Sequence, residues 1–475
     1  MGDILTEFAQ ASFDRQLELV DDPAHQAALT EMLGVDGLAS MRALPRADAG
    51  VLAAKPAPNT LFVPGVMGSV LSPAGLGGVW WLDVRARKEL NRLGLNREGS
   101  DDAEAGIDVQ PTAIDYSYSE FMAHGLAHDH VSVRGGWYDW RRRLTDSVDR
   151  IVGRVDELRA SNGGQPVHLV GHSMGGLIIR TALMERPVLW DKIGRIAFIG
   201  TPHHGSPAIA SYLKGHLWGT EPMAILGLYL SRATFQTLMG PLSLLPAPLG
   251  IYPNNPQLVG EHPCANFDLY DADAYELDFG GDADRRDALQ ARLDSVADHW
   301  RRLAAHQAGL SSDQQQRLLM IIGVGHETIF RLERDGSWFG RKDKKLRERS
   351  SGDPHREGDG RVPQASATLN GVAANRYVNG VHGELPNIPA VAATVFEWVT
   401  AGTVSPQLAT SAAEALDTGH LGGGPLAPVG LQGADGVDLY ADDRVVDELT
   451  DDERAALMAK LESGQIPRFE LTKIL

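Results

Sequence analysis

The 475-residue sequence has a single cysteine, no long apolar run and no excess of basic residues. Cys264 cannot form an internal disulfide, which favours a reducing compartment or a fold that needs no covalent cross-link. No apolar run approaches the ~18 residues that a membrane span requires, and no basic stretch followed by an apolar core opens the chain. We therefore expect a cytoplasmic protein without a signal peptide or transmembrane segment.

Basic charge is also scarce, since the formal net charge is -18. Binding of nucleic acid needs a basic face, so we expect no nucleic-acid partner and no general attraction to anionic membranes. The adjacent pair His203 and His204 is the one hint of a metal, but neighbouring side chains point in different directions. No carboxylate or cysteine stands at ligand spacing from them, so we expect neither a metal nor another cofactor.

The pentapeptide Gly171-His172-Ser173-Met174-Gly175 has the G-x-S-x-G pattern, which points to Ser173 as a catalytic nucleophile. In a strand-to-helix elbow the serine stands at the tip of a strained turn, where a Cβ on either flanking glycine would strike the neighbouring strand or helix. The pattern alone is weak, because chance supplies it in roughly a third of chains this long. Its context is favourable, because an apolar strand-like run precedes it and an apolar helix-like run follows it.

Short β-rich runs alternate with helical patterns along most of the chain. This alternation predicts an α/β fold with a mostly parallel central sheet and helices on both faces. We expect helices over 144–159 and 176–184, and strands at Thr60 to Val63, His130 to Val133, Val167 to Val170, Ile196 to Ile199, Leu318 to Val324 and Arg376 to Val378.

The spacing of these runs divides the chain into a core and three additions. Residues 58–202 and 317–402 form the expected core. Residues 203–316 are too many for a bare loop, so we expect a cap or lid over the carboxyl ends of the strands, where α/β sheets bind ligands. We expect short helices and a linker over residues 1–57. Residues 403–475 form an extension in which we expect a helix near 450–461.

A serine nucleophile needs a general base and an acid that orients it. The chain order in α/β-hydrolases, serine then acid then histidine, leads to Asp359 in a Gly-flanked turn and to His382 after the last strand-like run. Alternative acids stand nearby, at Asp353, Glu357 and Asp335. Asp359 could also be a carboxylate that only closes its turn, and His382 a surface or helix-capping histidine.

An oxyanion intermediate needs two hydrogen-bond donors aimed at the developing charge. The backbone N–H of Met174, directly after the serine, is one candidate. The early strand ending in Pro64-Gly65 offers Val66 N–H as the other, although this turn could simply end the strand.

Five separated segments together resemble the lecithin:cholesterol acyltransferase family of α/β-hydrolases, which includes lysosomal phospholipases and bacterial esterase or lipase relatives. The resemblance extends over residues 58 to 400, and its most specific element is Tyr-Asp-Trp-Arg at 138–141. It implies the triad Ser173, Asp359 and His382 and the oxyanion donors Val66 and Met174. The segments are Phe62 to Ser69, Trp81-Leu82-Asp83, Tyr138 to Arg141, Gly171 to Gly176, and Gly358-Asp359-Gly360 with Val381-His382-Gly383.

The resemblance implies a serine hydrolase of lipid acyl esters, a phospholipase, lipase or O-acyltransferase that forms an acyl-enzyme. A lipoprotein substrate is not expected, because secreted eukaryotic members carry disulfides and this chain has one cysteine. Alternatives are a soluble carboxylesterase acting on small esters, and a lipase gated by a protein docked on the terminal extensions. A non-catalytic binding scaffold usually lacks a triad member, whereas all three positions are filled here.

The expected cap contains the most apolar stretch of the chain outside the strands. Most of its residues must pack the cap onto the core. Some are also candidates to line an acyl tunnel or to contact a membrane surface peripherally. The lining candidates are Leu217, Trp218, Leu226, Phe235 and Leu244 in the cap, with Trp80 and Trp81, which equally fit ordinary core positions.

Overall fold

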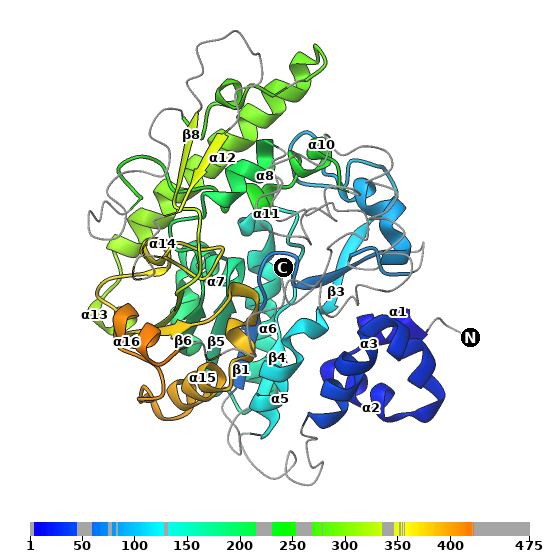
Figure 1. The fold of residues 1–475 in the computed structure, drawn as a ribbon, viewed down its shortest axis with the longest axis vertical. Helices are drawn as coiled ribbons and strands as arrows, with labels where there is room; N and C mark the ends of the chain where they lie inside the picture. The colour runs from blue at the N-terminus through cyan, green and yellow to red at the C-terminus, as the bar shows by residue number, and fades with distance from the viewer. Residues whose placement is uncertain are drawn as a thin grey trace.

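A six-stranded sheet forms the centre of the computed structural model (Figure 1). Its strand order is β10-β7-β6-β5-β1-β4, and every neighbouring pair is parallel. The strands are β1 (Asn59–Val63), β4 (Ser132–Gly135), β5 (Val167–His172), β6 (Ile193–Ile199), β7 (Leu318–Val324) and β10 (Ala374–Asn379). The structure describes residues 4–44, 59–74, 78–81, 84–127, 132–214, 230–252, 268–277, 279–334, 346–350, 353, 355, 357–419 and 421.

Side chains of the central strands alternate between two apolar clusters, one on each face of the sheet. In β1, Leu61 and Val63 join one cluster while Phe62 joins the other. The same alternation places Phe198 of β6 on the first face and Ile199 on the second. Burial on both faces explains why these strands are continuous apolar runs in the sequence.

Helices cover both faces. On the face of Leu61 lie α6 (Val148–Ser161), α7 (Met174–Glu185) and α12 (Ala283–Ala308), and on the face of Phe62 lie α5 (Ser119–Ala127) and α15 (Pro389–Ala401). The expectation of a mostly parallel sheet flanked by helices is therefore confirmed, and the fold is that of an α/β-hydrolase. Short helical turns connect these elements at η3 (Tyr116–Tyr118), η4 (Leu144–Ser147), η5 (Pro187–Asp191), η7 (His382–Asn387), α14 (Gln364–Ala367) and α16 (Ala412–Asp417).

The segment between β6 and β7 includes several helices among its described residues. It contains α8 (Ala208–Lys214), α10 (Arg232–Phe235), α11 (Met239–Leu242), η6 (Ala272–Tyr275), the long α12, and α13 (Ser312–Gln315). Most buried apolar side chains of this segment join the same cluster as the core helix α7. The division into core and cap stays a prediction, and the helix expected near 450–461 lies outside the described residues.

The N-terminal helices α1 (Ile4–Gln10), α2 (Phe13–Asp21) and α3 (Gln26–Ala43), with η1 (Pro23–His25), form a third apolar cluster. They pack on the antiparallel pair β2 (Ser69–Pro73) and β3 (Val109–Ile114), which contributes Val70 and Ala113. A second antiparallel pair is formed by β8 (Arg331–Arg334) and β9 (Leu346–Arg349). No described helix combines the length and the apolar character that crossing a bilayer requires.

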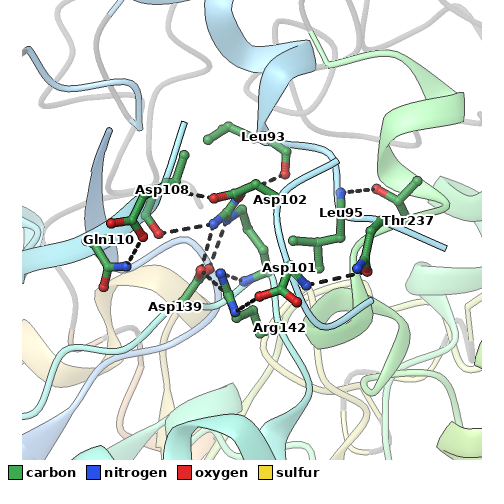
Figure 2. Close-up of polar contacts among 12 residues, drawn as sticks. Leu93, Leu95, Asp101, Asp102, Asp108, Gln110, Asp139, Arg142 and Thr237 are labelled. Carbon is green, nitrogen blue, oxygen red and sulfur yellow. Dashed lines mark hydrogen bonds and ion pairs between the residues drawn. The ribbon is translucent and has the colours of Figure 1, made fainter. Parts of the chain in front are cut away.

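The Tyr-Asp-Trp-Arg segment that follows β4 anchors the loop after η2 (Val84–Leu93) (Figure 2). The guanidinium of Arg141 has no exposed surface and bonds both oxygens of Asp139, at 2.9 and 2.7 Å, and one oxygen of Asp102 at 2.6 Å. It also donates to the Leu93 carbonyl oxygen at 3.0 Å. Arg142 reaches the same Asp139 carboxylate at 3.1 Å, so one aspartate joins two arginines.

Candidate active site

Ser173 lies between β5 and α7 in a backbone conformation that residues other than glycine rarely adopt. Its φ is 51° and its ψ is -127°, and its N–H donates to the Ile199 carbonyl oxygen of β6 at 2.9 Å. Positive φ at a serine is strained and persists only where the surroundings impose it. This is the strand-to-helix elbow that the pentapeptide predicts.

The glycines around Ser173 fill spaces that admit no side chain. A Cβ on Gly171 would lie 2.7 Å from the Cα of Gly176, and one on Gly175 would lie 2.2 Å from the Val63 carbonyl oxygen. The first residues of α7 therefore pack directly against the ends of β5 and β1. This close packing brings the turn after β1 next to the serine.

His382 and Asp359 lie in line with Ser173. Nε2 of His382 is 2.9 Å from the Ser173 hydroxyl oxygen, and Nδ1 of His382 is 2.7 Å from Oδ2 of Asp359. All three residues are buried: His382 is 4% exposed, Asp359 1% and Ser173 5%. The ring of His382 can thus accept the serine proton on one nitrogen while the carboxylate holds the other.

Asp359 also closes its own turn. Its Oδ1 accepts the N–H groups of Arg361 and Val362 at 3.0 and 2.7 Å, which leaves Oδ2 for the histidine. Two of the alternative acids accept hydrogen bonds from other backbone groups. Glu357 accepts the N–H of Thr328 at 2.7 Å, and Asp353 accepts the N–H of His355 at 3.0 Å. Asp335 lies outside the described residues.

The turn after β1 passes beside the serine. A Cβ built on Gly65 would lie 3.0 Å from the Ser173 Cβ. Val66 follows Gly65 in this turn, and the next residue, Met67, has a φ of 63°. Within the described part of the chain, neither the Val66 N–H nor the Met174 N–H hydrogen-bonds to another residue. Both predicted oxyanion donors are therefore free of protein acceptors among the described residues.

The predicted lining residues that the structure describes are core residues by burial. Trp81 is 1% exposed, donates its Nε1–H to the Met67 carbonyl oxygen at 2.7 Å and contacts the Trp140 ring edge-on. Trp80, Phe235 and Leu244 are each 5% exposed or less and join the same apolar cluster as Met174. Leu217, Trp218 and Leu226 lie outside the described residues.

His203 is buried and His204 is partly buried. His203 contacts the Phe198 ring edge-on, and burial lowers its pKa well below the ordinary value. His204 Nδ1 lies 3.3 Å from the Ser366 carbonyl oxygen. Among the described residues, no group of three or more histidines, cysteines, aspartates and glutamates is placed to hold a metal ion.

Two residues near the serine, His172 and Tyr118, were not among the predicted site residues. His172 belongs to the pentapeptide, which was the available signal, and Tyr118 follows β3 with no motif around it. Tyr118 also lines a cavity of about 320 Å³, together with residues of the α1–α2 connection and of the segment from β3 to β4. Ser173 does not line this cavity.

Comparisons with known proteins agree with this fold. A family model described as lecithin:cholesterol acyltransferase matches residues 118–293, which include Ser173 but not Asp359 or His382. A triacylglycerol lipase of Pseudarthrobacter phenanthrenivorans is 30% identical over 105 residues, 22% of this chain and 31% of the lipase. A phosphatidylcholine-sterol acyltransferase of Rattus norvegicus is 34% identical over 88 residues, 18% of this chain and 20% of that protein.

One solved structure, titled the crystal structure of the Tle4-Tli4 complex, contains a chain that aligns with 72% of this chain and 98% of its own length. The TM-score is 0.50 at 15% identity, a likeness of fold. The chain thus has the α/β-hydrolase fold. Part of it is similar to lecithin:cholesterol acyltransferases and triacylglycerol lipases, and it spans about a third or less of the length of these curated relatives.

Proposed function

We propose that this chain is a serine hydrolase of lipid acyl esters that works through Ser173, His382 and Asp359. The observation that carries the proposal is the pair of hydrogen bonds on His382, 2.9 Å to the Ser173 hydroxyl and 2.7 Å to Asp359. The strained elbow at Ser173 supports it, because strain at a nucleophile persists where the fold imposes it.

The proposed reaction has two steps. Ser173 Oγ attacks the ester carbonyl carbon as its proton passes to Nε2 of His382, and the Val66 and Met174 N–H groups bind the oxyanion. Collapse of the tetrahedral intermediate breaks the ester bond, and the leaving alcohol takes the proton from His382. Water, or an acceptor alcohol, then repeats the sequence on the acyl-enzyme and frees Ser173.

Lipid acyl esters are the proposed substrates because of the relatives and the apolar surroundings. The curated relatives are named as a triacylglycerol lipase and a phosphatidylcholine-sterol acyltransferase. Trp80, Trp81, Phe235 and Leu244 are the described candidates for an acyl-chain wall, because they join the apolar cluster that contains Met174. Leu217, Trp218 and Leu226 are proposed to complete it, with peripheral membrane contact through the same segment.

A protein partner is a second proposal. The solved chain of similar fold comes from a structure titled as a complex of two components. The segments 1–57 and 403–475 lie outside the proposed catalytic core and are the proposed docking regions. A partner on them would gate the proposed lipase rather than replace its chemistry.

Labelling with a fluorophosphonate tests the nucleophile, because this reagent modifies an activated serine and leaves ordinary serines unchanged. We expect one adduct per chain, located on Ser173 by peptide mass spectrometry. Ser173→Ala should remain unlabelled, and Ser206→Ala, at a buried serine that bonds the Arg361 carbonyl oxygen at 2.6 Å, should label like the wild type. An unlabelled wild-type protein, or equal labelling of Ser173→Ala, would contradict the assignment.

A further inference from the structure

Both polar groups of the Pro64–Gly65 peptide bond are held by buried tyrosines. The hydroxyl of Tyr138 donates to the Pro64 carbonyl oxygen at 3.0 Å, and the Gly65 N–H donates to the hydroxyl oxygen of Tyr118 at 3.0 Å. Tyr138 is 0% and Tyr118 6% exposed. Because the C=O and N–H of a trans peptide point in opposite directions, the two hydroxyls hold this peptide from opposite sides.

Gly65 explains why this peptide needs hydrogen bonds on both sides. A Cβ at this position would lie 3.0 Å from the Ser173 Cβ and 3.3 Å from Nδ1 of His172, so a larger residue would be crowded there. Glycine has the greatest conformational freedom of any residue. The Val66 N–H directly after it needs one fixed direction to stabilise an oxyanion. The two tyrosines remove the freedom that the glycine introduces.

The hydroxyl of Tyr118 also connects the turn to the loop of His382. It lies 2.9 Å from Nδ1 of His172, and Nε2 of His172 lies 3.0 Å from the His382 carbonyl oxygen. Since Tyr118 accepts the Gly65 N–H, its own proton is directed to Nδ1 of His172. The ring proton of His172 is then on Nε2 and is donated to the His382 carbonyl oxygen.

The opposite tautomer of His172 does not fit these contacts. It would leave the Tyr118 proton without an acceptor and set a nitrogen lone pair against the carbonyl oxygen of His382. Burial, with a smaller contribution from the neighbouring His382, lowers the pKa of His172 well below its ordinary value. Burial raises the pKa of Tyr118 above its ordinary value, so the imidazole stays neutral and the phenol protonated at neutral pH.

We propose that Tyr138, Tyr118 and His172 are positioning residues that hold the oxyanion turn and the backbone of His382 in fixed relation to Ser173. This inference rests on the proposed function, because it assumes the roles of Val66 and His382 given there. The hydrogen bonds run from Tyr138 through the Pro64–Gly65 peptide to Tyr118, then to His172 and His382. Loss of either tyrosine hydroxyl therefore frees one end of the same peptide.

The test compares Tyr118→Phe and Tyr138→Phe with a matched control, Tyr275→Phe. Tyr275 is 1% exposed and donates to the Leu269 carbonyl oxygen at 2.8 Å, within the segment between β6 and β7. We expect kcat on a p-nitrophenyl ester and the rate constant of fluorophosphonate labelling to fall about 10- to 100-fold in each of the first two variants. KM should stay within about two-fold, since ground-state binding is not removed.

The control should keep the wild-type kcat although it loses a similar buried bond. The double variant Tyr118→Phe/Tyr138→Phe should lose less than the product of the single losses, because both hydroxyls hold one peptide. A folded Tyr118→Phe protein with unchanged kcat, or an equal loss in Tyr275→Phe, would overturn the inference. Should Tyr118→Phe not fold, Tyr138→Phe decides alone by the same criteria. A wild-type protein that does not label would instead reject the proposed function.

Discussion

At the scale of single residues, Asp359 uses its two oxygens for two neighbours. Oδ1 closes the turn with the N–H groups of Arg361 and Val362, while Oδ2 faces Nδ1 of His382. An aspartate that closed its turn alone was the alternative from the sequence. The structure contains both contacts in one side chain, so the turn fixes the direction in which the second oxygen points.

Asp359→Asn should lower kcat by about 10³- to 10⁴-fold. The asparagine oxygen would keep the turn, which leaves the amide NH₂ facing Nδ1 of His382 and favours the wrong tautomer of the ring. Steady-state kinetics on a p-nitrophenyl ester, with circular dichroism to verify folding, measures this loss. Glu357→Gln is the control, since a glutamine oxygen can still accept the Thr328 N–H. A loss in Glu357→Gln as large as in Asp359→Asn would refute the assignment.

The sequence predicted Ser173, Asp359 and His382 as one group because each stands in a glycine-containing turn after a strand, in the order of the fold. It did not predict the contacts of Tyr118. This residue is 53 positions from Gly65 and 54 from His172, and no local pattern marks a pairing of that kind. Such contacts depend on how the strands are ordered in the sheet, which the sequence alone does not reveal.

At the scale of elements, the Tyr-Asp-Trp-Arg segment takes part in a buried ionic network (Figure 2). Arg141 has no exposed surface, so its charge must be compensated by Asp139 and Asp102. The network joins this segment to the loop after η2, and Tyr138 at its start holds Pro64. A motif conspicuous in the sequence thus supports the turn beside Ser173.

Asp139→Ala should lower the free energy of unfolding by about 3 to 5 kcal/mol, because it leaves the buried guanidinium of Arg141 with one carboxylate fewer. Urea unfolding followed by circular dichroism gives this value. Asp101→Ala is the control: its side chain is 72% exposed and contacts Arg142 at 3.4 Å, so the change should stay within about 0.5 kcal/mol. Equal stability of Asp139→Ala and the wild type would contradict a structural role for the network.

Strand prediction succeeded because the central strands are buried on both faces and stand out as apolar runs. β1, β5, β6 and β7 each include the run expected for them, and β10 extends the expected Arg376 to Val378 at both ends. The pair of β2 and β3 was not predicted. Its side chains are divided between the N-terminal helices and the core, and its strands contain Pro73 and Pro111, which weaken a strand pattern.

At the scale of the whole molecule, the family match covers residues 118–293, which include the proposed nucleophile Ser173. The family match ends at residue 293, whereas Asp359 and His382 come later in the chain. The rest of the site is therefore supported by the geometry of this chain alone. We propose that the segment between β6 and β7 sets the substrate, and most of its described buried apolar side chains pack into the core cluster.

We propose that long-chain lipid esters are the substrates, and the dependence of the rate on acyl-chain length tests this proposal. Wild-type protein would be compared on short- and long-chain p-nitrophenyl esters and on zwitterionic phosphatidylcholine vesicles, since a net charge of -18 disfavours anionic surfaces. Ser173→Ala is the control for background hydrolysis. We predict that kcat/KM rises with chain length and that the vesicles release fatty acid. A clear preference for short soluble esters, with no release from vesicles, would contradict the account and indicate a soluble carboxylesterase.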